Sequence, residues 1–257
     1  ESCATLEEMN GNVMATIRRG YSRINEYIGT FTGRVHIVGS GPSIKHTYKS
    51  IDSDVLAINS AIGFMIDHGI PPRLGMIWDA SPLCQAFAVP SEHTTYLIGA
   101  RCHESVFDRL KGQRVICWHA GGDHNIAEFL NEHKIDEPLI NGGSAGVTRA
   151  YALGYRDIHV HGADSSYSDE GETHIRGSLV HEKDMQVFVG GKWFRTTPEY
   201  CAQVEEFKSI WTMFHYMNYG ARITVHGKGM LPYVASMLQR NDELLTKHSQ
   251  PLEELAA

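Results

Sequence analysis

The sequence has little that would direct it to a membrane or to nucleic acid. No run in its 257 residues approaches the ~20 apolar residues of a membrane helix, and no basic segment followed by an apolar one opens it. Its 30 acidic residues outnumber 23 basic ones, which gives a formal net charge of −7. We therefore expect no membrane span. Nucleic acid is a disfavoured partner, although the charge alone does not exclude it.

Cysteine is also scarce and follows no pattern. The five cysteines are scattered and include no C-x-x-C pair, which argues against a disulfide framework or a zinc site. His119 and His124 match no standard metal-ligand spacing either, so we predict no metal site. Unpaired thiols fit a reducing compartment, and we expect a cytoplasmic protein.

Short apolar segments alternate with amphipathic ones along the chain. Hydrophobic residues make up 42% of it and no low-complexity linker interrupts it, so it can bury a large core. The alternation predicts an α/β fold with a single doubly wound, mostly parallel sheet and helices on both faces, as in Rossmann-like proteins. Strands are expected at residues 35–38, 55–59, 74–78, 95–98, 114–118, 158–161 and 222–226.

The pattern divides the chain into three parts. An N-terminal helix within residues 1–32, predicted over 4–28, packs on the main domain. Residues 33–240 are expected to form the main Rossmann-like domain, which the loops described below predict to be a nucleotide-binding catalytic domain, and residues 241–257 are expected to form a C-terminal tail.

One long irregular segment, residues 163–197, interrupts the main domain. A hairpin is expected within it around Gly190 and Gly191, and segments of this length are usually functional or mobile. A helix follows, with Thr196 as its cap and Glu199 placed as in a capping box.

The first candidate site follows the strand at 35–38. Glycines let backbone N–H groups approach an anion, and serines add hydroxyl donors. The loop matches neither the Walker pattern nor the dinucleotide pattern, so an ordinary tight turn is the competing interpretation. Its residues are Gly39, Ser40, Gly41, Pro42 and Ser43.

A second glycine-rich loop, residues 141–146, opens a predicted helix. Gly143 and Ser144 lie where free N–H groups and the helix dipole favour an anion. Close helix–sheet packing would also need small residues there. A second such loop in one chain favours the anion site.

Two polar residues end neighbouring predicted strands. Asn59 can contact a base or a ribose, or cap the next helix. Asp79 can bind a ribose, a metal or an acceptor hydroxyl, or form a turn. In the long segment, His174 or His181 can act as a general base near neutral pH, although a lone loop histidine is more often solvated.

Taken in order, these motifs resemble the 6-hydroxymethylpterin diphosphokinase-like (MptE-like) family, which includes motility accessory factors and phage proteins. The resemblance covers roughly residues 33–232 and rests on G-S-G-P-S, I-N-S-A, W-D, N-G-G-S-A, A-L-G-Y-R-D-I-H-V-H-G-A-D and G-E-T-H. The chain also resembles, more distantly, bacterial sialyltransferases that use CMP-sialic acid. A bacterial or phage-infected host cell is the expected setting.

The resemblance implies a role for each candidate residue. The loop at residues 39–43 would hold the nucleotide with Asn59 near its ribose or base, and Gly143 and Ser144 would hold the phosphate. Further roles fall in the long segment: Asp164 would line the site, Tyr167 would donate to the leaving phosphate, and His174 would be the base, with His181 as its substitute.

The sequence departs from the archaeal pterin diphosphokinases, which look richer in acid at the second and third loops. Here those loops are residues 59–61, Asn-Ser-Ala, and 79–81, Asp-Ala-Ser. A two-carboxylate Mg²⁺ site for pyrophosphoryl transfer is thereby in doubt.

Three functions therefore stay open. The favoured one is a metal-independent glycosyltransferase with a nucleotide-sugar donor, a hydroxyl acceptor of unknown identity and no tightly bound cofactor. The alternatives are an ATP- and Mg²⁺-dependent diphosphokinase acting on a hydroxymethylpterin-like molecule, and a nucleotide-binding protein without catalysis. Each of the three functions is compatible with a homo-oligomer.

Overall fold

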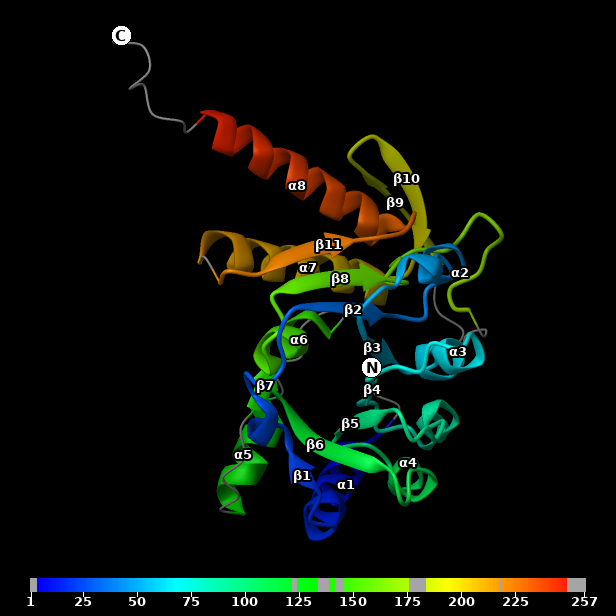
Figure 1. Cartoon of the computed structure of the whole chain (residues 1–257), viewed down its shortest axis with the longest axis vertical. Coiled ribbons are helices and arrows are strands. Elements are labelled where there is room, and N and C mark those ends of the chain that lie inside the picture. Colours follow the sequence, from blue (N-terminus) through cyan, green and yellow to red (C-terminus); the bar gives the residue numbers. More distant parts are fainter. Residues whose placement is uncertain are drawn as a thin grey trace.

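The computed structural model describes residues 4–121, 124–133, 139–141, 146–175, 184–217 and 219–248. Within these ranges nine strands form one parallel sheet, in the order β1-β6-β5-β4-β3-β2-β8-β11, with β7 paired to β6 (Figure 1). The predicted fold class is confirmed. The strands are β1 (Ser22–Arg23), β2 (Arg34–Val38), β3 (Asp54–Ile58), β4 (Leu74–Ile77), β5 (Thr95–Gly99), β6 (Arg114–Gly121), β7 (Leu139–Asn141), β8 (Asp157–His161) and β11 (Arg222–Val225).

Helices cover both faces of this sheet. The α-helices are α1 (Leu6–Arg18), α2 (Ile44–Thr47), α3 (Ala61–Asp67), α4 (Glu104–Arg109), α5 (His124–Glu132), α6 (Val147–Leu153), α7 (Pro198–Tyr216) and α8 (Met230–His248). Short 3₁₀ segments are η1 (Ile24–Tyr27), η2 (Tyr48–Ser50) and η3 (Pro82–Phe87). None of the described helices has both the length and the apolar character needed to cross a membrane.

The core lies on both sides of the sheet, because alternate residues of each strand point to opposite faces. In β3, Leu56 and Ile58 join the apolar cluster formed with α6, α7 and α8. Val55 and Ala57 of the same strand join the cluster formed with α3 and α4. A strand buried on both faces reads as a continuous apolar run, which is why the sequence located these strands well.

The first predicted helix is too long. Helix α1 of the structure begins after the Thr5 capping box with Glu8 and ends at Arg18, because Gly20 turns the chain with φ +67°. The residues that follow form β1 and η1 instead, and β1 is an edge strand paired with β6. The helix is fixed to the main sheet by Thr16, whose hydroxyl donates to the Ala100 carbonyl at 2.9 Å.

The other end of the main domain also differs from the prediction. Helix α8 runs through residue 240, where the sequence suggested that a tail begins. The cap of α7 is Thr197, whose Oγ1 accepts from the Tyr200 N–H, whereas the Thr196 hydroxyl donates to the Ser165 carbonyl. The predicted hairpin is present as β9 (Met185–Val189) and β10 (Lys192–Thr196), joined at Gly190 and Gly191.

The sheet reverses its winding at β2. From there the chain moves outward through β3, β4, β5 and β6 on one side, whereas β8 and β11 lie on the other. In open α/β sheets, ligands bind where the strand order reverses, beyond the carboxyl ends of the strands. The loops that follow β2 and β8 meet at this switch point.

These two loops approach so closely that only glycine fits. Gly39 donates its N–H to the His161 carbonyl at 2.8 Å, and Gly41 donates to the Gly162 carbonyl at 2.7 Å. A Cβ atom on Gly39 would lie 2.5 Å from the Gly162 oxygen, which is inside van der Waals contact. Gly162 additionally has φ +60°, a conformation that glycine adopts without strain.

We expect Gly39→Ala to destabilise the protein by ~3 kcal/mol, because the added methyl group must push two backbones apart. Gly11→Ala is the matched control. It lies inside α1 with no atom within 4 Å of the added Cβ, and should stabilise by about 0.5–1 kcal/mol. Urea unfolding of both variants measures the difference, and equal stability would contradict the close loop contact.

Candidate functional site

A cavity of about 360 Å³ opens at the switch point. The loops after β2, β3 and β8 form one side of it, and the first turns of α7 form another. Its lining residues are Gly39, Ser40, Gly41, Ile58, Asn59, Trp78, Gly162, Ala163, Asp164, Ser165, Thr173, His174, Tyr200, Gln203, Glu206 and Leu231. The topology thus brings the first glycine loop, Asn59, Asp164 and His174 together, as the sequence suggested.

The glycine loop works differently from a phosphate cradle. The N–H groups of Gly39 and Gly41 are used in the contact with the loop after β8, and the Ser43 N–H donates to Asp164. The glycines therefore allow close packing of two loops. Ser40 is the exception: it lines the cavity, and its hydroxyl makes no hydrogen bond within the described part of the chain.

Asp164 joins three loops at the switch point. One carboxylate oxygen accepts from the Ser43 N–H at 2.7 Å and the other from the Ser43 hydroxyl. Its backbone carbonyl accepts from Leu231 at the start of α8. Burial raises the pKa of Asp164, although both hydrogen bonds from Ser43 act in the opposite direction. With its carboxylate engaged in this way, Asp164 positions the loops.

Asn59 combines an unusual backbone with an unsatisfied side chain. Its φ of 51° is left-handed, and among the described residues only Ser165, with φ 49°, shares this property outside glycine. The Asn59 side-chain oxygen is buried and has no hydrogen-bond partner. Both left-handed residues line the cavity. Strained backbone and an unpaired buried acceptor are both typical of ligand sites.

His174 also lines the cavity. Its Nδ1 lies 3.1 Å from the Thr173 hydroxyl, and its Nε2 lies 3.5 Å from the Tyr200 hydroxyl. Burial lowers the pKa of His174. The imidazole is therefore neutral at neutral pH and can accept a proton.

Helix α7 contributes residues that sequence reasoning missed. Tyr200, Gln203 and Glu206 recur at three-residue spacing and so point to one side of the helix, into the cavity. Gln203 accepts from the strained Ser165 through its side chain at 3.2 Å. The three-residue spacing of these side chains was a signal available in the sequence.

Trp78 is another missed residue, one position before the predicted Asp79. Its indole lines the cavity and packs against the buried guanidinium of Arg149, which lies 5.3 Å from the Trp78 ring centre and 4.0 Å from that of Trp118. Burial lowers the pKa of Arg149 to about 10, so it stays cationic at neutral pH. The cation–π contact fixes the orientation of Trp78.

The other predicted residues lie elsewhere. Asp79 accepts from the Ser81 N–H at 2.8 Å, which is the turn-forming role, and does not line this cavity. Pro42 and Tyr167 line a second cavity on the far side of Asp164. His181, Gly143 and Ser144 lie outside the described residues.

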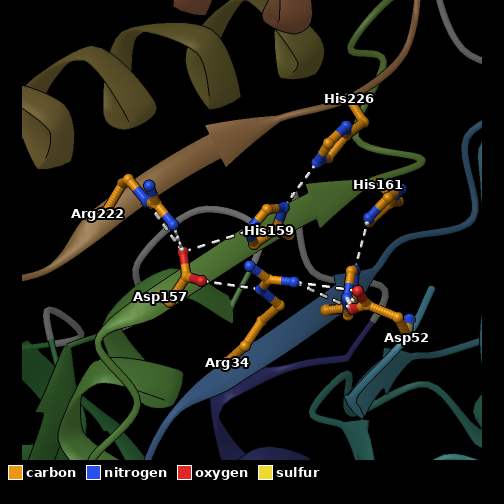
Figure 2. A network of polar contacts seen from close by, with 8 residues as sticks. Arg34, Asp52, Asp157, His159, His161, Arg222 and His226 are labelled. Atoms are coloured by element: carbon orange, nitrogen blue, oxygen red, sulfur yellow. Dashed lines mark hydrogen bonds and ion pairs between the residues drawn. The ribbon is translucent and has the colours of Figure 1, made fainter. Parts of the chain in front are cut away.

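Beneath the switch point, one face of β2, β8 and β11 carries a polar network (Figure 2). In the first chain of contacts, Asp52 lies 2.9 Å from His36, which lies 2.9 Å from His161. In the second, Asp157 lies 3.2 Å from His159, which lies 2.9 Å from His226.

Two arginines bind the aspartates of these two chains of contacts, and Arg34 bridges both aspartates. Arg34 donates to Asp157 at 2.8 Å and to Asp52 at 3.0 Å, and Arg222 donates to Asp157 at 3.1 Å. A hydrogen bond from His36 lowers the pKa of Asp52. Burial acts to raise the pKa of Asp157, but the two arginines hold it below its usual value. Both aspartates are therefore ionised at neutral pH.

The ionised aspartates determine the tautomers of the histidines. A carboxylate only accepts, so His36 and His159 each donate from Nε2, and a neutral ring then accepts at Nδ1. His161 and His226 then donate from Nε2 to these acceptors. This leaves the Nδ1 of His161 as a bare lone pair, and that atom is buried without a hydrogen-bond partner.

All four imidazoles lie in one array. The rings of His161 and His226 are stacked, with centroids 4.3 Å apart. Burial, followed by repulsion from the other three histidines, lowers the pKa of His161 to about 3. Burial also lowers the pKa of His159 and His226. Among the described side chains, no group of three or more His, Cys, Asp or Glu residues is arranged to hold a metal ion.

Comparison with known proteins adds a family and a fold. The family model described as 6-hydroxymethylpterin diphosphokinase MptE-like matches residues 11–170, which is more than half of the chain. No curated protein matches the chain. The Maf glycosyltransferase from Magnetospirillum magneticum AMB-1 aligns with a TM-score of 0.62 and 19% identity, over 86% of this chain.

This structural likeness shows the fold alone, and the chain spans only 36% of the Magnetospirillum protein. A protein from Lactobacillus plantarum aligns with a TM-score of 0.29 and 13% identity, over 76% of this chain and 62% of that one. The second alignment is too weak to support an argument about the fold.

The histidine array should make the protein sensitive to mild acid. His161 binds its proton near pH 3 in the native state and near pH 6.5 when unfolded, so between these values the unfolded chain binds more protons. Stability is full above pH ~6.5 and falls as the pH drops, by about 2 kcal/mol at pH 5 from His161 alone.

His161→Gln tests this dependence by denaturant unfolding at pH 7.5 and pH 5. Glutamine can still donate to His36 but does not titrate, so the variant should lose less stability on acidification than the wild type. The exposed His93, changed to glutamine, is the control and should keep the wild-type pH dependence. The raised pKa of Asp164 has the opposite effect in all three proteins, so the comparison between variants isolates His161. Identical pH dependence in all of them would refute the assignment.

Proposed function

The chain belongs to the 6-hydroxymethylpterin diphosphokinase MptE-like family, which supports transfer chemistry in general, and on that premise we propose that it transfers a group from a nucleotide bound at the switch point. The preferred reaction is metal-independent glycosyl transfer from a nucleotide-sugar to a hydroxyl acceptor. The nucleotide donor is a substrate, and no tightly bound cofactor is invoked.

The observation that carries the proposal is the buried, unpaired side-chain oxygen of Asn59 on a left-handed backbone. Leaving a buried acceptor without a donor costs about 1–3 kcal/mol. Asn59 lines the cavity, so a rotation of its side-chain amide would bring this oxygen to a ligand N–H or O–H there, such as an exocyclic amine or a ribose hydroxyl. The Ser40 hydroxyl on the adjacent loop and the Trp78 indole provide a second polar contact and an apolar surface for such a ligand.

The chemistry we propose needs a base and a leaving phosphate. Neutral His174 takes the proton of the acceptor hydroxyl on a ring nitrogen. The acceptor oxygen forms the new bond to the sugar carbon. The bond from that carbon to the phosphate oxygen breaks, and the nucleotide leaves with the electron pair.

The carboxylates near the cavity favour this reaction over phosphoryl transfer. Asp164 is engaged by Ser43, and Asp79 forms a turn. Among the described residues, Asp164 and Glu206 are the carboxylates that line the cavity, and with Asp164 engaged they do not form the pair of open carboxylates that would suit a nucleotide-bound Mg²⁺. The solved glycosyltransferase has the same fold, so this architecture accommodates the reaction.

The description of the family favours one alternative, an ATP-dependent diphosphokinase acting on a hydroxymethylpterin-like molecule. It would require Mg²⁺ to bridge the transferred phosphates. A thermal-shift screen with and without Mg²⁺ separates the two reactions. Stabilisation by CMP or by a nucleoside diphosphate (CDP, UDP or GDP) without metal supports glycosyl transfer. Stabilisation only by ATP or AMP with Mg²⁺ supports the diphosphokinase. Binding without any turnover would leave a nucleotide-binding protein.

Asn59→Gly removes the side-chain amide while keeping a residue that tolerates positive φ. We expect the nucleotide found in the screen to bind about tenfold more weakly, the equivalent of one hydrogen bond to a buried acceptor. Isothermal titration calorimetry measures the change. The exposed Asn25, changed to glycine, is the control. Unchanged affinity in Asn59→Gly would remove the main support for the nucleotide site.

His174→Gln tests the base. Because glutamine cannot accept the proton, we expect turnover of the identified donor to fall ~10²–10⁴-fold with nucleotide affinity nearly unchanged. His93→Gln should behave as wild type. Turnover of His174→Gln at the wild-type rate would assign proton abstraction to another residue.

A further inference from the structure

A second cavity, of about 450 Å³, lies on the other side of Asp164, which lines both cavities. We propose that it is the acceptor subsite and that it takes a small molecule bearing a phosphate or carboxylate group. The role as an acceptor subsite rests on the proposed function. The anion-binding property itself rests only on the cavity and its charged groups.

Four separate segments enclose this cavity. They are α2 with Lys45 and His46, the loop at residues 166–172, strand β10 with Lys192, and the turn before α8 with Lys228. A space of this volume, walled on several sides, suits a compact molecule. Pockets for small ligands typically measure about 300–1,000 Å³.

Two of the ammonium groups on its wall lack a carboxylate partner. Neither Lys192 nor Lys228 forms an ion pair within the described part of the chain. Lys192 is held from behind: its Nζ lies 5.0 Å from the Phe194 ring centre and 5.9 Å from that of Tyr233. Cation–π contacts orient the ammonium without neutralising it, so its charge is available to a ligand.

Lys228 stands directly before the start of α8, a helix of 19 residues. The first amides of this helix are already used, since Met230 donates to the Ser166 hydroxyl and Leu231 to the Asp164 carbonyl. These bonds fix the turn that carries Lys228 against the loop after β8. The two lysines thus reach the cavity from a hairpin and from a helix start that the fold holds in place.

The acidic residues of the cavity limit what can enter. Lys45 is bound to Glu172 at 2.6 Å, so this pair is neutral. Asp169 and Glu170 remain on the wall of the loop. Their charge repels a long polyanion such as a nucleic acid strand, but leaves room for one anionic group at Lys192 and Lys228. The charge pattern therefore favours a small acceptor with a single anionic end.

The position of the cavity supports its role in transfer. Ser43 and Asp164 form the boundary between the two cavities, with Ser43 lining the second and Asp164 lining both. An acceptor whose anionic end binds Lys192 would therefore have to extend its hydroxyl past Ser43 and Asp164 to reach the donor and His174 in the first cavity. Tyr167, which the resemblance linked to the leaving phosphate, lines the acceptor side with the Arg195 guanidinium 4.3 Å from its ring centre.

The test is the binding of inorganic pyrophosphate to the full chain, measured by calorimetry with the double variant Lys192→Gln/Lys228→Gln. We expect binding to weaken about tenfold, the equivalent of two partly exposed ion pairs. The control, Lys49→Gln/Lys111→Gln, removes the same charge from exposed positions outside the cavity and should bind pyrophosphate as the wild type does. Nucleotide affinity should stay unchanged in both double variants.

Every other outcome contradicts the proposed acceptor subsite in whole or in part. No pyrophosphate binding to the wild type refutes it while leaving the nucleotide proposal intact. Equal weakening in the control shows a general charge effect, and loss of nucleotide binding in the Lys192 and Lys228 variant assigns these lysines to the donor. If no nucleotide binds any variant but pyrophosphate binding still depends on the two lysines, the anion site stands and the transfer reaction fails.

Discussion

The close approach of the loops after β2 and β8 is the constraint on which the rest of the site depends. Gly39 and Gly162 bring two backbones into contact at the point where the sheet reverses its winding. A third loop joins them, because a Cβ on Gly227 would lie 2.5 Å from the Ser43 hydroxyl. Three strand ends therefore converge around one buried carboxylate, Asp164, and the cavities form on either side of it.

This packing changes how the glycine loop should be understood. The amides of Gly39 and Gly41 are used between loops, so in the proposed site the recognition of a ligand would depend on side chains around the convergence point. Asn59 and Ser40 offer polar groups, Trp78 offers an aromatic face, and α7 supplies Tyr200 and Gln203. A glycine motif can thus mark a ligand site because it shapes the surrounding space, even where it makes few contacts itself.

The sequence predicted seven of the nine described strands of the sheet, the switch-point loops and the gathering of Asn59, Asp164 and His174, because apolar runs and loop positions are local features. What it could not predict depends on pairing. His36 and His161 are 125 positions apart and meet only because β2 pairs with β8. The choice of Thr197 over Thr196 as the cap also depends on a distant partner, since Ser165 takes the Thr196 hydroxyl.

The same pairing places the histidine array directly under the site. His161 and His226 immediately precede Gly162 and Gly227, the glycines that hold the loops together. A positive charge on either ring would be buried beside three other imidazoles, so the folded state keeps them neutral and orders their tautomers from Asp52 and Asp157. A purely apolar layer would pack there without this acid sensitivity. A change in the protonation of His161 or His226 would therefore affect the geometry of the adjacent glycine loops, and a change in that geometry would affect the protonation of the two histidines.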